Sequence, residues 1–379
     1  MRRLLNPFVL VASTILLAGY AYLAWRVTSS GVARVALAVP FVMVWVVPLV
    51  YWFGDRERRS AVDEILQALS YVCMGCLSFL FVLSVGRDAL LLGTAALPPL
   101  SGAHDRLRDD GVAWVLAGSL AALAVGALAA LRGPHVRHVD IPLEGLDPDL
   151  EGFRIVQISD LHVGPTMRGA YVRRVVGMTR ALAPDLIALT GDIVDGPVPR
   201  LAHHVAPLAE LAAGGRAFLV LGNHDYYAGA AAWSAHFEAM GLRLLRNAHV
   251  MVARGAARLL VGGVTDPAAR LYDPDAGPRP DLAAADAAGA AFRLLLAHNP
   301  KIAPLAEKSG FDLQLSGHTH AGQFFPWTLA VRLVHAPHVA GLSRQGRMWV
   351  YVSAGTGTWG PPVRFGTTPE LTVLRLVRA

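Results

Sequence analysis

Four long apolar runs before residue 133 constrain the fold of this chain more than any other feature of its sequence. They cover about residues 7–25, 35–53, 66–85 and 112–131. As a helix, each run of about 20 residues would be ~30 Å long, which matches the hydrocarbon core of a bilayer. Charged residues gather between the runs, as in "GDRERRS" and "HDRLRDDG". We therefore predict a four-helix transmembrane region over residues 1–133.

The alternative is that the four runs are buried helices of a soluble bundle. Such helices keep a polar face, and no polar face recurs at helical spacing in these runs. The composition also opposes this alternative, because 54% of the residues are hydrophobic and only 16% are charged. Cys73 and Cys76 both lie in the third run. We interpret them as small apolar side chains of the membrane core, since no other metal ligands accompany them.

The first apolar run resembles a signal peptide, and we interpret it as an uncleaved signal anchor because further runs follow. Basic residues in short loops set the orientation of such a protein. With the N-terminus inside, the inner loops hold Arg2, Arg3, Arg56, Arg58, Arg59, Arg132 and Arg137. The outer loops then hold Arg26, Arg34, Arg87, Arg106 and Arg108. This count favours a multi-pass protein of the cell membrane whose chain after residue 131 lies in the cytoplasm.

The chain changes character after residue 131, where apolar stretches typical of strands alternate with helical stretches. Examples are "FRIVQIS", "DLIALT", "RAFLVL", "FRLLLA" and "FDLQLS". Strands separated by helices predict an α/β domain, and strands without strict alternation predict sheets covered on both faces. There are too many strands for one small parallel sheet. We therefore predict two packed sheets flanked by helices, a four-layer α-β-β-α sandwich, over residues 134–379.

Five of the predicted strands end in side chains that bind metal ions. These side chains are Asp160, His162, Asp192, Asn223, His298, His318 and His320. Ligands bind at the carboxyl ends of strands in such sheets. This part of the chain has no cysteine, so any metal would take oxygen and imidazole ligands. Seven donors exceed the need of one tetrahedral ion, which predicts two adjacent divalent ions bridged by one carboxylate.

Two of the spacings skip one residue, in Asp160-x-His162 and in His318-x-His320. In an extended backbone, both side chains of each pair would face the same way. Any one of these residues could instead cap a turn, but five such strand ends together favour a metal site. Glycines that permit sharp turns beside the ligands are Gly191, Gly222 and Gly317.

The blocks "DLH", "GDIVD", "GNHD", "AHNP" and "GHTH" occur in the order and approximate spacing of the calcineurin-like metallophosphoesterase superfamily, which residues 134–379 resemble. The stretches "GHTHAGQFFP" and "YVSAGTGTWGPPVRFGTTPE" are similar to its bacterial membrane-associated branch. That branch is related to lipid-sugar pyrophosphatases such as UDP-2,3-diacylglucosamine hydrolase. Gly196 stands where the protein phosphatases of the superfamily have an arginine, which counts against a phosphoprotein phosphatase.

The resemblance implies a role for each strand-end residue. Asp160, His162 and His320 would hold the first ion, Asn223, His298 and His318 the second, and Asp192 would bridge both. His224 is similar to the family's non-ligand histidine, which protonates the leaving oxygen or orients the phosphate. We expect Asp225 to be its partner, and otherwise expect Asp195 and Asp225 to be turn residues or hydrogen-bond acceptors. Mn, Fe or Zn suits these ligands best, and a hydroxide bridging the two ions would attack phosphorus in line.

Two features near the last motif allow two interpretations each. His335 and His338 flank a proline and are interpreted as exposed loop histidines, with substrate contact as the alternative. The segment "FFPW", residues 324–327, either packs in the core or forms an apolar lip that faces the bilayer. Such a lip would suit a phosphate ester with lipid tails.

The sequence therefore predicts a membrane-anchored, metal-dependent phosphohydrolase that cleaves a phosphodiester or pyrophosphate, with a lipid or cell-envelope intermediate as one substrate class. An alternative within this class is a phosphodiesterase of soluble cyclic nucleotides. An alternative of another class is a membrane sensor or scaffold with a non-catalytic metal-binding domain, which predicts degraded motifs. A transporter is disfavoured because the predicted spans hold no charge pair. The net charge is +6, but the sequence has no basic patch with interleaved aromatic residues, so no nucleic-acid partner is expected.

Overall fold

The computed structural model of the protein describes residues 7–53, 61–286 and 288–379. The chain divides into two compact units. One contains Met1–Leu128 and Gly360–Val363, and the other contains Ala129–Trp359 and Arg364–Ala379. Five of the arginines used in the orientation prediction lie outside the described residues, namely Arg2, Arg3, Arg56, Arg58 and Arg59.

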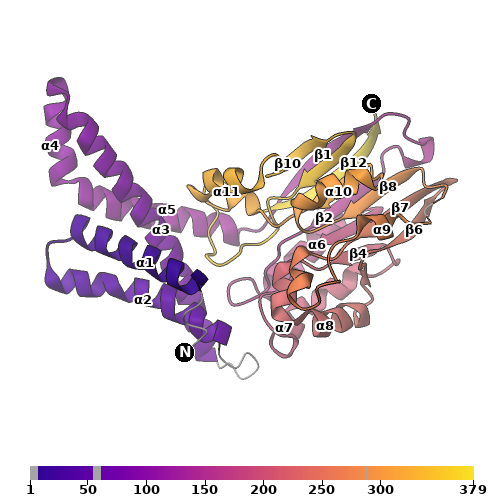
Figure 1. Ribbon diagram of the computed structural model, residues 1–379, viewed down its shortest axis with the longest axis horizontal. Helices are drawn as coiled ribbons and strands as arrows, with labels where there is room; N and C mark the ends of the chain where they lie inside the picture. The colour runs from indigo at the N-terminus through magenta and orange to yellow at the C-terminus, as the bar shows by residue number, and fades with distance from the viewer. Residues whose placement is uncertain (1–6, 54–60, 287) are drawn as a thin grey trace. The chain divides into compact units, whose positions relative to one another are not determined.

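The first unit is built from helices (Figure 1). Its elements are α1 (Pro7–Arg26), α2 (Gly31–Phe53), α3 (Ala61–Ala95), the 3-10 turn η1 (Pro98–Leu100), α4 (Ser101–Asp109) and α5 (Gly111–Leu131). Four of them, α1, α2, α3 and α5, are long and apolar enough to cross a membrane, as predicted. α3 is longer than the predicted span, with 35 residues. At 1.5 Å per residue it measures ~52 Å, more than the ~30 Å hydrocarbon core.

A charged cluster links α1 and α3 within this unit. Arg26 makes two hydrogen bonds of 2.6 Å to the carboxylate of Asp88, and the Tyr22 hydroxyl donates to the same carboxylate at 2.8 Å. Arg87 also donates to Asp88, at 2.9 Å. The ion pair lies just past the predicted ends of the first and third spans, yet Asp88 is inside the apolar part of α3. The predicted spans, residues 7–25 and 66–85 among them, contain no charged residue, so this ion pair lies outside them.

The second unit contains two six-stranded sheets. One has the order β1 (His135–Leu143), β12 (Glu370–Arg378), β2 (Arg154–Ile158), β3 (Leu186–Thr190), β4 (Ala217–Val220) and β5 (Arg243–Leu244). The other has the order β10 (Gly341–Gln345), β11 (Met348–Val352), β9 (Leu313–Ser316), β8 (Phe292–Leu296), β7 (Ala257–Gly263) and β6 (Ala248–Arg254). The strands β2 to β5 run parallel in the first sheet, as do β7, β8, β9 and β11 in the second. Parallel strands bring their carboxyl ends to one edge of each sheet.

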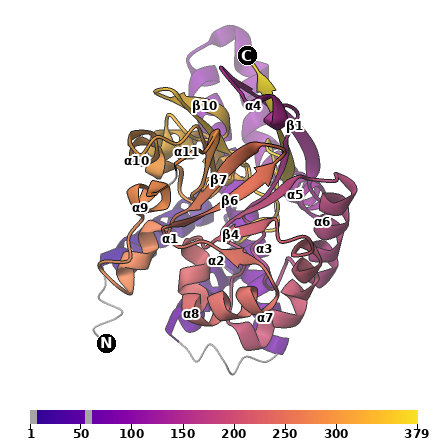
Figure 2. The ribbon, with the colours of Figure 1, turned by 90° about the vertical axis from the view of Figure 1, so that its right-hand side faces the viewer.

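Helices cover the outer face of each sheet, as the end view in Figure 2 shows. The first sheet is covered by α6 (Gly169–Ala181), α7 (Val198–Val205), η3 (Ala206–Leu211) and α8 (Asn223–Ala239), and the second by α9 (Pro280–Ala284), η5 (Pro300–Ile302) and α10 (Ala303–Lys308). The remaining short elements are η2 (Pro148–Leu150), η4 (Pro267–Leu271), η6 (His320–Gly322) and α11 (Trp327–His335).

The core forms three apolar layers, one between the sheets and one under each set of helices. In β2, Ile155 faces the layer between the sheets while Val156 faces the helices. Both faces of the strand are therefore apolar, which is why its sequence does not alternate. Trp233 of α8 is fully buried against the first sheet. The predicted four-layer α-β-β-α sandwich is confirmed.

Candidate metal centre

The strand ends of both sheets place all seven predicted metal ligands together. Asp160 and His162 follow β2, Asp192 follows β3, and Asn223 begins α8 directly after β4. From the second sheet, His298 follows β8, and His318 and His320 follow β9. Except for the half-buried Asn223 and His318, these side chains are buried. The two sheets thus meet at a polar cluster at the carboxyl edge of their parallel strands.

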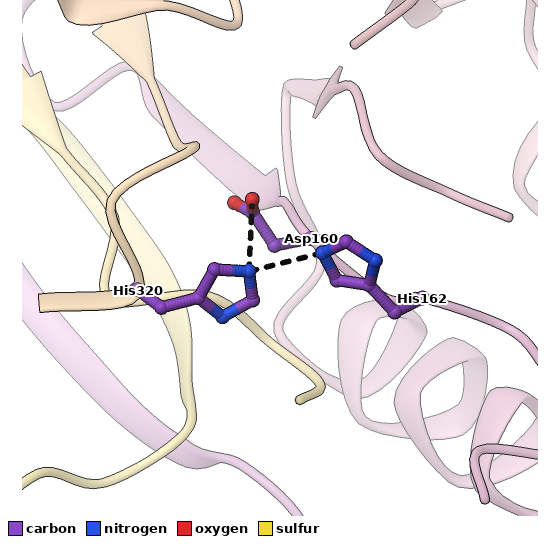
Figure 3. A group of neighbouring side chains, drawn as sticks. All are labelled: Asp160, His162 and His320. Carbon is purple, nitrogen blue, oxygen red and sulfur yellow. Dashed lines mark hydrogen bonds and ion pairs between the residues drawn. The ribbon is translucent and has the colours of Figure 1, made fainter. Parts of the chain in front are cut away.

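One group of donors consists of Asp160, His162 and His320, whose ligand atoms all lie within 4.8 Å of one another. The Nε2 atoms of His162 and His320 are 3.0 Å apart, and His320 Nε2 is 3.4 Å from Asp160 Oδ1 (Figure 3). The three side chains converge from β2 and from the loop after β9. Two imidazole nitrogens and one carboxylate oxygen in this arrangement match the donor set of a divalent metal site.

A second group consists of Asp192, His298 and His318, which also meet within 4.8 Å. Asp192 Oδ2 lies 3.2 Å from His298 Nε2. The Asn223 side-chain oxygen joins this group, at 2.9 Å from His318 Nδ1 and 3.2 Å from His298 Nε2. Asp192 Oδ2 also lies 3.7 Å from His162 Nε2 of the first group. One carboxylate therefore faces both groups of donors.

The backbone of the ligand loops is left-handed, not extended. The φ angles are 54° at Asp160, 48° at His162, 52° at Asp192, 72° at His318 and 51° at His320. The prediction that the skip-one pairs lie in extended backbone is therefore wrong. In fact His318 turns toward the second group of donors and His320 toward the first. Non-glycine residues in this region cost of order 1–3 kcal/mol each and cluster at functional sites.

All three predicted glycines are required by close approach, and a Cβ at Gly191 would overlap the backbone of Gly222. A Cβ at Gly222 would overlap the carboxylate of Asp192, and a Cβ at Gly317 would overlap the carboxylate of Asp160. Neither glycine has a positive φ, so space and not backbone freedom requires them. The expectation of sharp turns holds at Gly191, where φ is 87°.

Hydrogen bonds to the far ring nitrogens orient two of the histidines. His298 Nδ1 lies 2.8 Å from the carbonyl oxygen of Thr190, which can only accept, so Nδ1 carries the hydrogen. His162 Nδ1 lies 2.9 Å from Asp195 Oδ1 in the same way. In the neutral rings, the lone pair is then on Nε2, the atom that faces the other donors. Metal-binding histidines are held by this kind of contact.

The electrostatics of the cluster also suit divalent ions. Burial, together with nearby His298, lowers the pKa of His318 to about 3, so this ring is neutral and able to bind a metal. Burial opposes charge on His298 as well, but Asp192 and then Asp160 hold its pKa well above the usual range. Although burial favours a neutral Asp192, His298 and His224 hold the pKa of its carboxyl well below the usual range. A divalent ion would replace the proton on His298 as the charge that balances these carboxylates.

His224 stands beside the donors with Asp195, not Asp225, as its partner. Its Nδ1 lies 2.8 Å from Asp195 Oδ1, the same oxygen that contacts His162. Burial opposes charge on His224, but Asp192 and Asp195 outweigh burial and raise its pKa to about 9. The predicted partner, Asp225, is fully buried and accepts instead from backbone N–H groups of residues 193, 194 and 222. The predicted pairing with Asp225 is therefore wrong.

Asp195 is a hydrogen-bond acceptor, as expected, and it contacts two rings of the site. Two further residues at the site were not found from the sequence. Trp359 is exposed and packs against His224, with the two ring centroids 5.9 Å apart. Arg364 is fully buried and donates to the backbone carbonyls of residues 320, 355 and 357. The signal available was the stretch "TWGPPVRF", which carries both Trp359 and Arg364 but ends no predicted strand.

The structure decides among the interpretations of His335, His338 and the segment FFPW. His338 is buried and bonds to Ser343 and Gln345, so the expectation of an exposed loop histidine is wrong for it. His335 is on α11, and the centroids of the His335 and His318 rings are 5.3 Å apart. In "FFPW", Phe324 is 3% exposed and packs inside, whereas Phe325 and Trp327 are 43% and 47% exposed. Core packing thus describes the first residue of this segment only.

Comparisons with known proteins identify the family of this chain. The calcineurin-like phosphoesterase family matches residues 153–322. The chain is 32% identical to the transmembrane protein with metallophosphoesterase domain of Danio rerio, over 98% of this chain and 89% of that protein. It is 34% identical to an uncharacterized metallophosphoesterase of Helicobacter pylori, over 66% of this chain and 66% of that protein.

Among solved structures, the calcineurin-like phosphoesterase YfkN from Bacillus subtilis is similar, with a TM-score of 0.40 and 15% identity over 55% of this chain and 82% of that one. The matching family and the transmembrane relatives confirm the resemblance to the calcineurin-like metallophosphoesterase superfamily. The chain belongs to the calcineurin-like metallophosphoesterase family and is a membrane protein with metal-dependent phosphoesterase activity.

Proposed function

We propose that this protein is a membrane-anchored phosphohydrolase with two divalent metal ions, which cleaves a phosphodiester or pyrophosphate of a lipid or cell-envelope intermediate. In this proposal residues 1–133 anchor the protein by four spans and residues 134–379 form the catalytic domain in the cytoplasm. The proposal concerns the number of ions, the mechanism, the substrate class and the orientation. The phosphoesterase family itself is given by the relatives described above.

The observation that carries the two-ion proposal is the position of Asp192. Its Oδ2 lies 3.2 Å from His298 Nε2 in one donor group and 3.7 Å from His162 Nε2 in the other. A carboxylate in this position could bind an ion in each group. Asp160, His162 and His320 would hold the first ion, and Asn223, His298 and His318 the second. When bound, two such ions supply an activated water and screen the charge of the phosphate.

The residues around the ligands supply proton transfer and orientation. His224 lies beside Asp192, to whose Oδ1 its backbone N–H donates at 2.8 Å, and its ring meets His162 and Asp192 within 4.8 Å in a third group of candidate ligands. We assign it the protonation of the leaving oxygen, which is a general acid's role. Asp195 accepts from the Nδ1 atoms of both His162 and His224. It therefore positions a ligand and the acid with one carboxylate.

The surroundings of His224 favour a substrate with an apolar part. Trp359 contacts the His224 ring and is 47% exposed, and Tyr227, 42% exposed, lies 5.6 Å from the same ring. An aromatic wall beside the acid binds an apolar or ring-bearing leaving group. In a protein that is itself anchored to the bilayer, a lipid substrate is present at high effective concentration. An aromatic wall stacks a nucleobase as well, so it is the membrane anchoring that favours a lipid phosphoester over a soluble nucleotide.

The test uses the full-length protein purified in detergent micelles, with bound metal counted by elemental analysis. Hydrolysis of bis-p-nitrophenyl phosphate, a lipid-linked pyrophosphate and a cyclic nucleotide is measured with and without Mn²⁺. We expect metal-dependent turnover that is lost in Asp192→Ala and His224→Ala. The exposed Asp273→Ala variant, on the same domain, is the control and is expected to keep full activity.

Three results would contradict different parts of this proposal. A protein that binds two ions per chain and hydrolyses none of these substrates would favour the sensor alternative. Turnover of the cyclic nucleotide without turnover of the lipid-linked substrate would exclude the lipid part. A reporter fused after residue 379 that is active only outside the cytoplasm would exclude the proposed orientation.

A further inference from the structure

Helix α11 turns its apolar side outward. None of its nine residues is buried. Thr328, Val331 and His335, one or two turns apart, are half-buried and face the body of the domain. On the outward side of the helix, Leu329, Leu333 and Val334 are 55%, 90% and 60% exposed. A surface helix of a soluble domain normally shows the reverse pattern, with its apolar side facing the core.

The exposed apolar surface continues into the segment before the helix. Phe325 lies two residues before α11 and is 43% exposed, and Trp327, the first residue of α11, is 47% exposed. Tryptophan and phenylalanine beside leucine and valine are the side chains that enter the interface between lipid headgroups and acyl chains. We call Phe325, Trp327, Leu329, Leu333 and Val334 the α11 apolar surface.

The segment that carries this surface has basic residues and no acidic ones. Between Asp312 and Glu370 the chain contains no aspartate or glutamate, whereas it contains Arg332, Arg344 and Arg347, in addition to the buried Arg364. Arg332 is on α11 itself and is exposed. An apolar helix with arginine and without acidic residues complements the negative surface of an anionic bilayer. A soluble protein partner would not require the absence of acidic residues over so long a stretch.

The chain itself keeps a bilayer within reach of the domain. α5, which is long and apolar enough to cross a membrane, ends at Leu131, and β1 of the catalytic domain begins at His135. Four residue steps span at most ~14 Å of extended chain. The domain therefore begins next to the membrane surface whenever α5 spans it.

We propose that the α11 apolar surface lies in the headgroup region of an anionic bilayer. The opposite side of the helix contacts the metal centre, because the His335 ring is 5.3 Å between centroids from that of His318. The helix thus connects the membrane surface to the candidate site. The contact with lipid does not depend on which phosphoester the site cleaves, so it is tested without measuring turnover.

The experiment places an environment-sensitive fluorophore on α11 in the full-length protein. Cys73 and Cys76, the two native cysteines, are replaced by alanine, and Leu333→Cys is labelled with a nitrobenzoxadiazole probe. The control is Leu271→Cys in η4, which is 73% exposed on the same domain. Both proteins are reconstituted in nanodiscs of phosphatidylglycerol and phosphatidylcholine. A second position on the surface, Leu329→Cys, covers the case in which the first variant does not fold.

We expect the probe at position 333 to shift its emission to shorter wavelength in nanodiscs and to show a several-fold lower quenching constant for iodide than the control. Lipids with a doxyl group near the headgroup should quench it, and should leave the control unchanged. Equal iodide quenching at positions 333 and 271 would overturn the proposal. A probe shielded from iodide but not quenched by doxyl lipids would also overturn it, because the surface would then be covered by protein, such as a second copy of the chain.

Discussion

The exchange Asp195→Asn tests whether one carboxylate supports both a metal ligand and the proposed acid. Asp195 Oδ1 is 2.9 Å from His162 Nδ1 and 2.8 Å from His224 Nδ1. Asparagine has nearly the same shape, so its oxygen can still accept from both rings. It has no negative charge, and its amide nitrogen donates where a carboxylate oxygen would accept. The substitution therefore weakens two contacts without opening a cavity.

The size of the effect follows from these two hydrogen bonds. A hydrogen bond to a charged group contributes about 1.5–3 kcal/mol and a neutral one about 0.5–1.5 kcal/mol, so each contact loses about 1 kcal/mol. Together they lose about 2 kcal/mol, which corresponds to a roughly 30-fold lower kcat/KM. This value lies within the roughly 10–100-fold effects measured when residues that hold metal ligands are replaced.

The assay is Mn²⁺-dependent hydrolysis of bis-p-nitrophenyl phosphate by the full-length protein, compared among Asp195→Asn, His224→Ala and the double variant. If Asp195 acted through His224 alone, the double variant would match His224→Ala. We expect a further loss in the double variant and a higher Mn²⁺ concentration for half-maximal activity, because His162 is also affected. Activity of Asp195→Asn within about twofold of the parent, with unchanged metal dependence, would refute the reasoning.

Three further predictions concern the glycine contacts, the metal and the helical unit. Gly222→Ala should abolish metal-dependent activity because its Cβ would displace the Asp192 carboxylate. Gly177→Ala, whose Cβ would have no neighbouring atom within 4 Å, should remain active, and turnover measured for both variants checks this. Removal of metal by EDTA should lower the free energy of unfolding of the catalytic domain by ~2.7 kcal/mol, the value expected for an ion at a hundred times its Kd, and should thereby lower its thermal unfolding midpoint. An equal shift in Asp192→Ala would contradict binding at this site. Asp88→Asn should destabilise the protein in detergent by about 2 kcal/mol because its charged hydrogen bonds are partly buried. Asp140→Asn, in an exposed ion pair, should change stability by less than about 1 kcal/mol. Thermal unfolding of both variants tests this, and equal shifts would contradict the role given to burial.

Most of the architecture could be predicted because it follows from local patterns. Apolar runs of membrane length predicted the four long helices. Strands without alternation predicted sheets covered on both faces, and the structure has one apolar layer between the sheets and one under each set of helices. The rule that parallel strands share one carboxyl edge placed seven candidate ligands near each other. Each of these inferences depends on the period of the chain or on the direction of a strand, which the sequence contains.

The details of the site were decided by the tertiary structure alone. The sequence favours Asp225 as the partner of His224 because the two are adjacent, whereas in the structure the partner is Asp195. The side chains of Asp195 and Asp225 differ in direction because Asp225 is turned toward backbone N–H groups, while Asp195 comes from the loop after β3. Left-handed φ angles at His318 and His320 send neighbouring rings to different donor groups. Side-chain direction depends on these backbone angles, which no spacing of residues specifies.

The same distinction applies to α11. Its composition was readable from the sequence as apolar, and an apolar helix is equally compatible with a core or with an exposed surface. Packing decides between the two, because the side of α11 that faces the domain carries Thr328, Val331 and His335 and leaves Leu333 outside. The sequence by itself therefore determined which elements and which ligand types this protein has. The tertiary structure determined which side chains share a partner and which apolar surface is left for the membrane, because both depend on contacts between segments far apart in the chain.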